Sequence, residues 1–300
     1  MMKNTLISPL LSLLLLAGSA SCALAQDIPT VKGHLRYIFA PVCKQASFIC
    51  DGQLVCLSND GHAKSYPLYS TADSIEFDLA SVTMKPHCNV ANLVRKGGRN
   101  YLYVTEWNQQ RRLFVEQIAF SPQARQWSTR LVQTFTLQIP DSIMGAGFCD
   151  WVVDARKQRL YLFTYCDPTP DNDRKGTGVI LMEMKLPRPT DGDRTFTQQD
   201  ILRRVKLPYM AVTQDKEVHR GKLYITAGLR TSAKRNWDKS RQIMVFDLKT
   251  FQPEKFINLS HHNDEPEGID FVRGPIPGNR HKGWHMLLTY RNNMYELTTP

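Results

Sequence analysis

Short apolar runs recur along the chain, and each is followed by a polar turn and a second run in which apolar and polar residues alternate. Such alternation, in runs rich in β-branched and aromatic residues, is the pattern of half-buried β-strands, so each pair predicts a β-hairpin. The first runs of the pairs are 53–58, 101–105, 160–164, 223–226 and 286–289. Their partner runs are 63–68, 113–120, 179–186, 243–248 and 294–297.

The hairpins repeat at an interval that suits a β-propeller. Markers at residues 55, 103, 162, 225 and 288 are 48, 59, 63 and 63 residues apart, which is enough for a four-stranded blade with its loops. Segments 129–137, 201–207 and 255–259 predict fourth strands, and a turn-bearing strand such as 48–50 precedes each central run. The sequence therefore predicts an all-β fold, a β-propeller with five blades.

The two ends of the chain indicate how the ring closes. The last repeat stops after its third strand at Pro300, whereas 31–39 predicts a strand that belongs to no repeat. An N-terminal strand that completes the last blade would leave no exposed central edge. Six blades are the alternative if 167–200 contains another unit, and a β-sandwich is a more distant one. The polar insertions are expected to be loops: 167–177, 188–199, 230–239 and 275–282.

The first residues have the features of an export signal. Lys3 is followed by an apolar stretch at 6–17 and by Ala23-Leu24-Ala25, a small-x-small cleavage motif. We expect 1–25 to be a signal peptide and 26–300 to form a single propeller domain, periplasmic or extracellular.

A lipoprotein anchored at Cys22 is the less favoured alternative, because the usual Leu three residues earlier is absent. No later stretch approaches the length of a membrane span, so no transmembrane segment is predicted.

The composition is that of an ordinary globular protein, with 300 residues, of which 42% are hydrophobic, and a net charge of +10. Such a charge favours anionic partners, for example an envelope component, but it does not indicate nucleic acid by itself.

Six cysteines remain after removal of the signal peptide, which permits up to three disulfides in an exported chain. If Val153 pairs with Leu162, Cys149 lies opposite Cys166, so a cross-strand disulfide between these two is geometrically possible. No cysteine and histidine spacing typical of a zinc finger is present.

Polar residues precede or begin the first strand of each repeat, and in a propeller these strands line the central channel. Distant parts of the sequence should therefore meet in one polar channel mouth. The candidate ligand-binding residues there are His87, Asn89, Asp150, Asp215, Glu265 and Glu267. The alternative is that these side chains satisfy strand-end backbone groups or channel water.

The most distinctive string is Glu265-Pro266-Glu267-Gly268-Ile269-Asp270. Its two glutamates point the same way if the segment is extended, and paired carboxylates can bind a cation, hold sugar hydroxyls or share a proton. Trp107 and Trp151, each beside an acidic residue, are candidates for stacking on sugar rings.

This string, the His87-x-Asn89-x-x-Asn92 string and the Tyr-rich second strands resemble exported bacterial β-propellers in which a Pro-Glu-Gly signature begins a late blade. The layout is also similar to that of the six-bladed gluconolactonase-like propellers, although their early Glu-Gly-Pro opening is absent. That resemblance implies a divalent cation such as Ca²⁺ at the channel mouth. The residues that would hold it are Glu267, Asn89, Asp150 and Asp215.

Two classes of function follow. The chain has no GxSxG elbow, Walker-A loop, GxGxxG or HExxH string, which leaves no identifiable nucleophile or base. We expect a binding or interaction module of the cell envelope that recognises a carbohydrate, a peptide or another envelope ligand at the channel mouth. The alternative is a metal-assisted hydrolase or lactonase that uses the acidic mouth.

Overall fold

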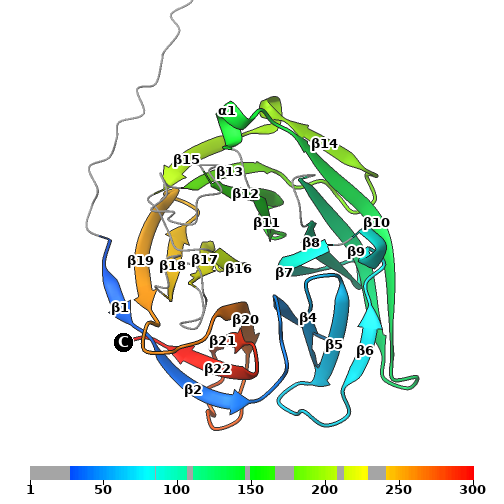
Figure 1. The fold of residues 1–300 in the computed structure, drawn as a ribbon, viewed down its shortest axis with the longest axis vertical. Helices are drawn as coiled ribbons and strands as arrows, with labels where there is room; N and C mark the ends of the chain where they lie inside the picture. Colours follow the sequence, from blue (N-terminus) through cyan, green and yellow to red (C-terminus); the bar gives the residue numbers. More distant parts are fainter. Residues whose placement is uncertain are drawn as a thin grey trace, which may run out of the picture.

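The computed structural model describes residues 28–84, 86–106, 111–145, 149–165, 179–207, 213–228 and 241–300. Five sheets radiate from a common axis, and Figure 1 looks down this axis onto the ring. The protein is a five-bladed β-propeller, as the repeat predicted.

Each blade has four antiparallel strands, arranged in order outward from the axis, and the sheets of blades 2 and 4 each have a fifth, parallel strand at the outer edge. Blade 1 contains β3 (Ser47–Cys50), β4 (Gln53–Leu57), β5 (His62–Pro67) and β6 (Ile75–Asp78). Blade 2 contains β7 (Pro86–Lys96), β8 (Arg99–Glu106), β9 (Arg112–Ser121) and β10 (Gln126–Gln138). Blade 3 contains β11 (Cys149–Asp154), β12 (Arg159–Tyr165), β13 (Val179–Lys185) and β15 (Arg203–Leu207).

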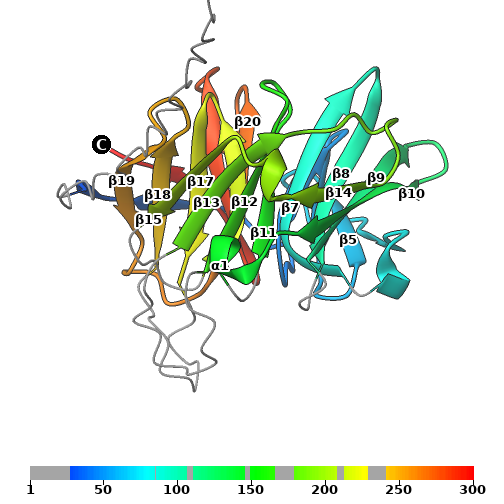
Figure 2. The ribbon, with the colours of Figure 1, turned by 90° about the horizontal axis from the view of Figure 1, so that it is seen from above.

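Blades 4 and 5 contain the C-terminal strands. Blade 4 contains β16 (Thr213–His219), β17 (Lys222–Ala227), β18 (Gln242–Asp247) and β19 (Gln252–Asn258). Blade 5 contains β20 (Pro266–Arg273), β21 (Trp284–Tyr290), β22 (Asn293–Thr298) and, as its outer strand, β2 (His34–Phe39). Figure 2 shows the ring from its edge, with the visible strands running roughly along its axis.

The N-terminal strand closes the ring, as predicted. β2 pairs antiparallel with β22, so that Leu35 lies opposite Leu297. The predicted strand at 31–39 is nevertheless divided at Gly33, because its first part, β1 (Thr30–Lys32), joins the outer edge of blade 4 parallel to β19. The N-terminal segment therefore pairs with both blades.

Gly33 permits this crossing between blades. A Cβ atom at this position would lie 2.7 Å from Leu259 and 2.9 Å from both Ile257 and Leu297. Those three side chains belong to the apolar layer between blades 4 and 5, so only a residue without a side chain fits there.

The core is divided into layers between neighbouring blades. One layer joins blades 2 and 3 and contains Tyr103, Phe135 and Trp151, while another joins blades 5 and 1 and contains Phe39, Leu54 and Leu287. Successive residues of a strand point to opposite faces of the blade. Since each blade packs against a neighbour on both faces, its strands place apolar residues in both layers.

Two predictions about the insertions and the strand register were wrong. Part of the predicted loop at 188–199 forms β14 (Arg194–Thr197), which pairs parallel with β10 on blade 2 and buries Phe196. The strands described in 167–200 thus belong to blades 3 and 2 and form no sixth blade.

The predicted facing of Cys149 and Cys166 is also corrected. Val153 pairs with Leu160 rather than Leu162, which places Cys149 opposite Thr164. Cys149 is a buried free thiol, and Cys166 lies outside the described residues.

Short helical segments complete the fold: α1 (Asp141–Met144) and the 3-10 turns at Val82–Met84 and Gln198–Asp200. In the part of the chain that the structure describes, none of these is long enough to cross a membrane.

The Gly33 crossing gives the first prediction. Gly33→Ala should lower the free energy of unfolding by about 1–3 kcal/mol, because the added methyl group overpacks the layer between blades 4 and 5. Lys32→Ala, an exposed neighbour, should change it by less than about 0.5 kcal/mol. Chemical denaturation measures both, and equal effects of the two substitutions would contradict the role of Gly33.

Candidate functional site

The inner strands bring several of the predicted polar residues together. β7, β11, β16 and β20 surround the axis (Figure 1), and hydrogen bonds join residues near the beginning of β7, β11 and β16. The Asn89 side-chain amide on β7 donates to the carbonyl oxygens of Thr213 and Gln214 on β16, at 3.3 and 3.4 Å. The Asn89 side chain therefore satisfies backbone carbonyl groups, which was the alternative to ligand binding.

A buried lysine lies at the centre of this network. The Lys216 side chain is completely buried, and its Nζ lies 2.5 Å from Oδ2 of Asp150 on β11. The same ammonium donates to Thr213 Oγ1 and to the Gln214 carbonyl, both at 2.9 Å, and lies 4.9 Å from the centre of the Phe163 ring. Lys216 therefore joins blades 3 and 4 by an ion pair shielded from solvent.

Asp215 joins blades 4 and 5. Its Oδ1 accepts the Lys216 backbone N–H at 2.8 Å, and its Oδ2 accepts the Ile269 N–H at 3.0 Å. Burial raises the pKa of Asp215 well above its usual range, and these two N–H donors oppose that rise. Both carboxyl oxygens are thus used within the protein.

A second polar layer lies further along the strands, three residues after Asn89 on β7. The Asn92 amide donates to the Lys216 carbonyl and to Glu217 Oε2, both at 2.8 Å, and its oxygen accepts the Val153 N–H at 3.0 Å. Asn92 thereby connects blades 2, 3 and 4. Burial, together with Asp215 and Asp270, raises the pKa of Glu217.

Asp270 is the corresponding acid between blades 5 and 1. Its Oδ2 accepts the Ser47 hydroxyl at 2.9 Å. Burial raises the pKa of Asp270 to about 7, against the lowering effect of Ser47 and of the Ile49 backbone. Gly268 makes this contact possible, because a Cβ atom there would overlap the Ser47 and Thr289 hydroxyls.

The four predicted metal ligands do not form a metal site. Among the described residues, no group of three or more His, Cys, Asp or Glu side chains is placed to hold a metal ion. The reason lies in their partners: Asp150 binds the Lys216 ammonium, Asp215 accepts two N–H groups, and Asn89 turns its amide toward carbonyl oxygens. The positive charge in this part of the channel belongs to Lys216.

His87 is half-buried near Asp150. Burial lowers the pKa of His87 to about 4, although the Asp150 charge acts in the opposite direction. The imidazole is therefore neutral at neutral pH.

The two glutamates of the Pro-Glu-Gly string lie where β20 begins. Glu267 is only 5% exposed, and its Oε2 has no hydrogen-bond partner among the described residues. Burial raises the pKa of Glu267 well above its usual range, and Glu265 and Cys43 raise it further. Glu267 thus lies close to the segment at 40–46 that links β2 to β3, at the seam between blades 5 and 1.

The predicted aromatic platform is not at the mouth. Trp151 is 1% exposed and packs against Phe135 and Phe196, with ring centroids 6.4 and 6.0 Å away. Successive residues of a strand point to opposite faces. Trp151 follows Asp150 on β11 and therefore points into the apolar layer between blades 2 and 3 instead of the channel. Trp107 lies outside the described residues.

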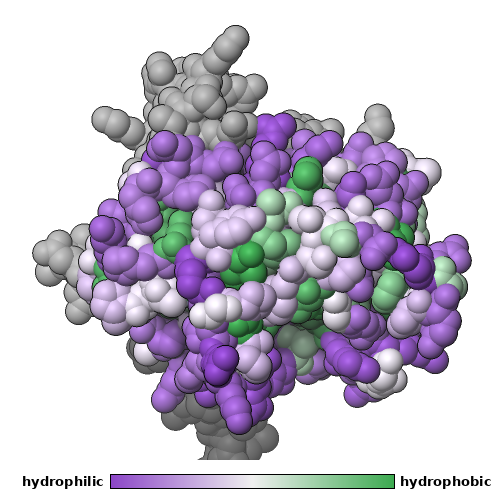
Figure 3. All heavy atoms as spheres, turned by 90° about the horizontal axis from the view of Figure 1, so that it is seen from below, coloured by the Kyte–Doolittle hydropathy of each residue, from purple (hydrophilic) through white to green (hydrophobic). Residues whose placement is uncertain are grey.

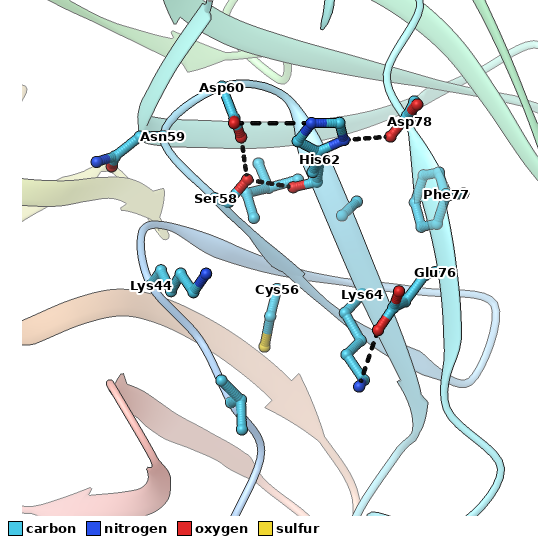
Figure 4. Close-up of a pocket in the computed structure, with 13 residues that line it drawn as sticks. Lys44, Cys56, Ser58, Asn59, Asp60, His62, Lys64, Glu76, Phe77 and Asp78 are labelled. Atoms are coloured by element: carbon cyan, nitrogen blue, oxygen red, sulfur yellow. Dashed lines mark hydrogen bonds and ion pairs between the residues drawn. The ribbon is translucent and has the colours of Figure 1, made fainter.

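Sequence reasoning missed a groove on blade 1 (Figure 4). Its volume is about 740 Å³, and it lies between the segment at 40–46 and the side of β4, β5 and β6 that faces blade 5. The turn after β4 and the segment before β3 lie at the same end of the blade as the channel mouth. The polar and charged lining residues are Lys44, Ser58, Asn59, Asp60, His62, Lys64, Glu76 and Asp78.

The charges of the groove are paired along one wall. His62 Nδ1 lies 2.5 Å from Asp78 Oδ1, and hydrogen bonding to Asp78 together with the Asp60 charge raises the pKa of His62. Lys64 Nζ donates to Glu76 at 3.1 Å. Lys44 projects from the facing segment in Figure 4, so charged groups border the groove on both sides.

Apolar surface lies on the same side of the ring. Figure 3 views the molecule from the side of blades 1 and 5 and shows apolar atoms gathered near the middle of a polar rim. Tyr37 on β2 is 53% exposed and Val42, which lines the groove, is 49% exposed. The seam therefore offers both charged and apolar contacts.

Comparisons with known proteins support the fold. No family model and no curated protein sequence matches the chain. The glutaminyl cyclase of Myxococcus xanthus is similar in structure, with a TM-score of 0.50, 11% sequence identity, and coverage of 91% of this chain and 98% of that one. A tail fibre of Staphylococcus aureus phage P68 has a TM-score of 0.49 and 14% identity over 89% of this chain and 52% of that one.

The similarity to the glutaminyl cyclase structure, together with the ring of sheets, defines the class: the protein is a five-bladed β-propeller. At such low identity the likeness extends to the fold alone. Since no family model matches the chain, none supports its resemblance to exported propellers with a Pro-Glu-Gly signature.

The buried ion pair gives a prediction for stability. Lys216→Met should lower the free energy of unfolding by about 3–5 kcal/mol, because it leaves the Asp150 carboxylate shielded from water without its partner. Lys216→Met combined with Asp150→Leu should recover part of this loss. Lys222→Met, which removes an exposed ion pair with Glu254, should cost less than about 1 kcal/mol. A loss for Lys216→Met as small as that of the control would contradict the central role of the ion pair.

The Asp270 carboxyl gives a prediction for pH dependence. The pKa of Asp270 is about 7 in the folded protein and about 3.8 when unfolded, so the folded state binds the proton more tightly. This group therefore stabilises the fold fully below about pH 4, and its contribution is lost as the pH rises to about 7. Asp270→Asn should accordingly raise the Tm relative to wild type above about pH 7, and the two Tm values should converge in acid. Glu76→Gln, an exposed acid, serves as the control, and a constant difference between Asp270→Asn and wild type at every pH would refute the assignment.

Proposed function

We propose that the protein is a binding propeller of the cell envelope, exported by its N-terminal signal, and that it holds a carbohydrate or a peptide on the face that carries the channel mouth. The resemblance to exported propellers with a Pro-Glu-Gly signature agrees with this proposal. The binding site would extend from Glu265 and Glu267 into the groove of blade 1.

The feature that supports this proposal most is the buried carboxyl of Glu267, which lies close to Cys43 in the segment whose neighbouring residues line the groove. This carboxyl shares a hydrogen bond with Glu265, and its Oε2 has no partner among the described residues. A buried polar atom without a partner is costly, so its retention favours a ligand that satisfies it. The groove adds a volume of about 740 Å³, within the range of small-molecule sites.

The lining indicates the chemistry of the ligand. Burial raises the pKa of Glu267, which favours its protonated form, and a protonated carboxyl can donate to a sugar hydroxyl or a peptide carbonyl. Lys44 provides a positive group for an acidic substituent, whereas His62 and Lys64 are paired with Asp78 and Glu76 on the opposite wall. An anionic oligosaccharide or an acidic peptide fits this lining.

Metal-assisted hydrolysis is less well supported. It requires several oxygen ligands that are available to one cation. Asp150 and Asp215 instead have partners in Lys216 and in backbone N–H groups, so binding without catalysis accounts for the channel better.

Substitution of Glu267 separates a binding role from a structural one. Glu267→Leu should raise or preserve the Tm, since it removes a buried carboxyl, yet it should weaken ligand binding at least tenfold, about 1.4 kcal/mol. Glu267→Gln, which keeps the shape and a donor group, should retain binding within a few fold. Glu254→Leu on the outer strand of blade 4 is the matched control.

A glycan array and a panel of acidic peptides identify the probe, and titration calorimetry with the tightest one measures the affinities. Binding of a probe by wild type and its loss in Glu267→Leu alone would support the proposal. Absence of binding to every probe, or equal binding by Glu267→Leu and wild type, would overturn it.

A further inference from the structure

Two cysteines meet at the seam between blades 5 and 1. Cys43 belongs to the segment at 40–46 that follows β2, and Cys56 lies on β4. The two residues are 0% and 3% exposed and belong to the same apolar layer. Their thiols are within hydrogen-bonding reach of each other, and both are reduced in the structure.

The backbone holds this pair from both sides. The Cys43 N–H donates to the Arg291 carbonyl of blade 5 at 2.8 Å, and the Val42 N–H donates to the Tyr66 hydroxyl of blade 1 at 3.1 Å. Two residues later, the Gln45 N–H donates to the Leu57 carbonyl at 3.0 Å, next to Cys56. The contact between the thiols is therefore fixed by the fold.

The neighbouring cysteines have other surroundings. Cys50 lies opposite Gln53 in the hairpin, and its sulfur contacts Asn100 and Asp51 at 3.2 and 3.5 Å. Cys56 lies opposite Ser47 rather than Cys50, although both cysteines flank the same turn. Cys88 belongs to a different layer, between blades 1 and 2.

We propose that Cys43 and Cys56 form a disulfide, which locks the closing segment of the ring to blade 1. The oxidant is a disulfide donor of an oxidising compartment, either a dithiol carrier in its oxidised form or oxidised glutathione. The Cys43 thiolate attacks the donor disulfide, forms a mixed disulfide and releases one donor sulfur. The Cys56 thiolate then attacks the Cys43 sulfur and releases the second. The donor gains two electrons, and the two thiol protons end on its two sulfurs.

The order of events follows from burial. Burial and the adjacent Cys43 raise the pKa of Cys56, so in the folded protein this thiol is a poor nucleophile. The bond therefore forms before blades 5 and 1 have packed together. It closes a loop of 14 residues, from 43 to 56, and since Lys44 and Cys56 both line the groove, it fixes two of the groove walls to each other.

The chain offers a direct way to locate the bond. Trypsin cleaves after Arg36, Lys44 and Lys64, and a protease that cleaves before aspartate cuts before Asp51 and Asp60. Together they place Cys43, Cys50 and Cys56 on three separate peptides. The mature chain is refolded in a buffer of reduced and oxidised glutathione, denatured, alkylated without reductant, digested and analysed by mass spectrometry.

The expected product joins the peptide 37–44 to the peptide 51–59 and is lighter by two hydrogen atoms than the two reduced peptides together. Alkylated Cys50 and Cys88 in the same sample are the internal controls. Recovery of Cys43 and Cys56 as separate alkylated peptides, or linkage of either one to another cysteine, would overturn the proposal.

Variants provide a second readout. Reductant should lower the Tm of the refolded wild type and leave the Tm of Cys43→Ala and of Cys56→Ala unchanged. Under oxidising conditions the double variant should be no less stable than the less stable single variant, whereas Cys88→Ala should keep the response to reductant. If Cys43→Ala still responds to reductant as wild type does, the bond is not the one proposed.

Discussion

The structure depends on the pairing of β2 with β22. A ring of sheets has no stable end unless its last sheet meets its first, and here the last blade is completed by residues from the start of the domain. Because β1 also pairs with β19, the N-terminal segment spans blades 4 and 5, and Gly33 makes that passage sterically possible. The chain then enters blade 1 through the segment at 40–46. That segment forms one wall of the groove and carries Cys43, so the distinctive chemistry of the surface lies at the point of closure.

The channel has a different character from the seam. Its polar groups have partners within the protein: Lys216 pairs with Asp150, Asp215 accepts two backbone N–H groups, and Asn92 on blade 2 binds groups on blades 3 and 4. Such a network fixes how the blades sit relative to one another, since all of these contacts except that between the Lys216 N–H and Asp215 join two blades. It also uses up the groups that a metal ion would need. Glu267 departs from this pattern, and it does so at the end of the channel nearest to the groove.

Much of the fold could be predicted from the sequence, because each hairpin is encoded locally by alternation and by a turn. The blade number and the closing strand followed from counting repeats, as did the outer strands at 129–137 and 255–259. Edge strands were harder: β14 lies in a polar insertion, and its parallel pairing with β10 depends on a distant segment. Register was also harder, since a shift of two residues on β12 keeps the apolar pattern and yet moves Cys149 from Cys166 to Thr164.

The candidate site could be predicted only in part. The Glu265-Pro266-Glu267 string located the seam glutamates, because Pro and Gly mark a constrained strand entry. Lys216 was missed, since one lysine between two acids is typical of an exposed strand and nothing local indicates that it is buried. Trp151 was misplaced for a related reason: its neighbour Asp150 lies on the channel, but the next side chain along a strand points elsewhere. The groove on blade 1 depends on the path of the closing segment, which no local pattern encodes.

The N-terminal strand β2 is an integral part of the last blade. Native-state hydrogen exchange of the mature protein tests it most directly, because paired amides in one cooperative unit open together. We expect the amides of β2 that pair with β22 to exchange as slowly as those between β21 and β22, through the same global unfolding. Fast exchange throughout β2, while β21 and β22 stay protected, would contradict it.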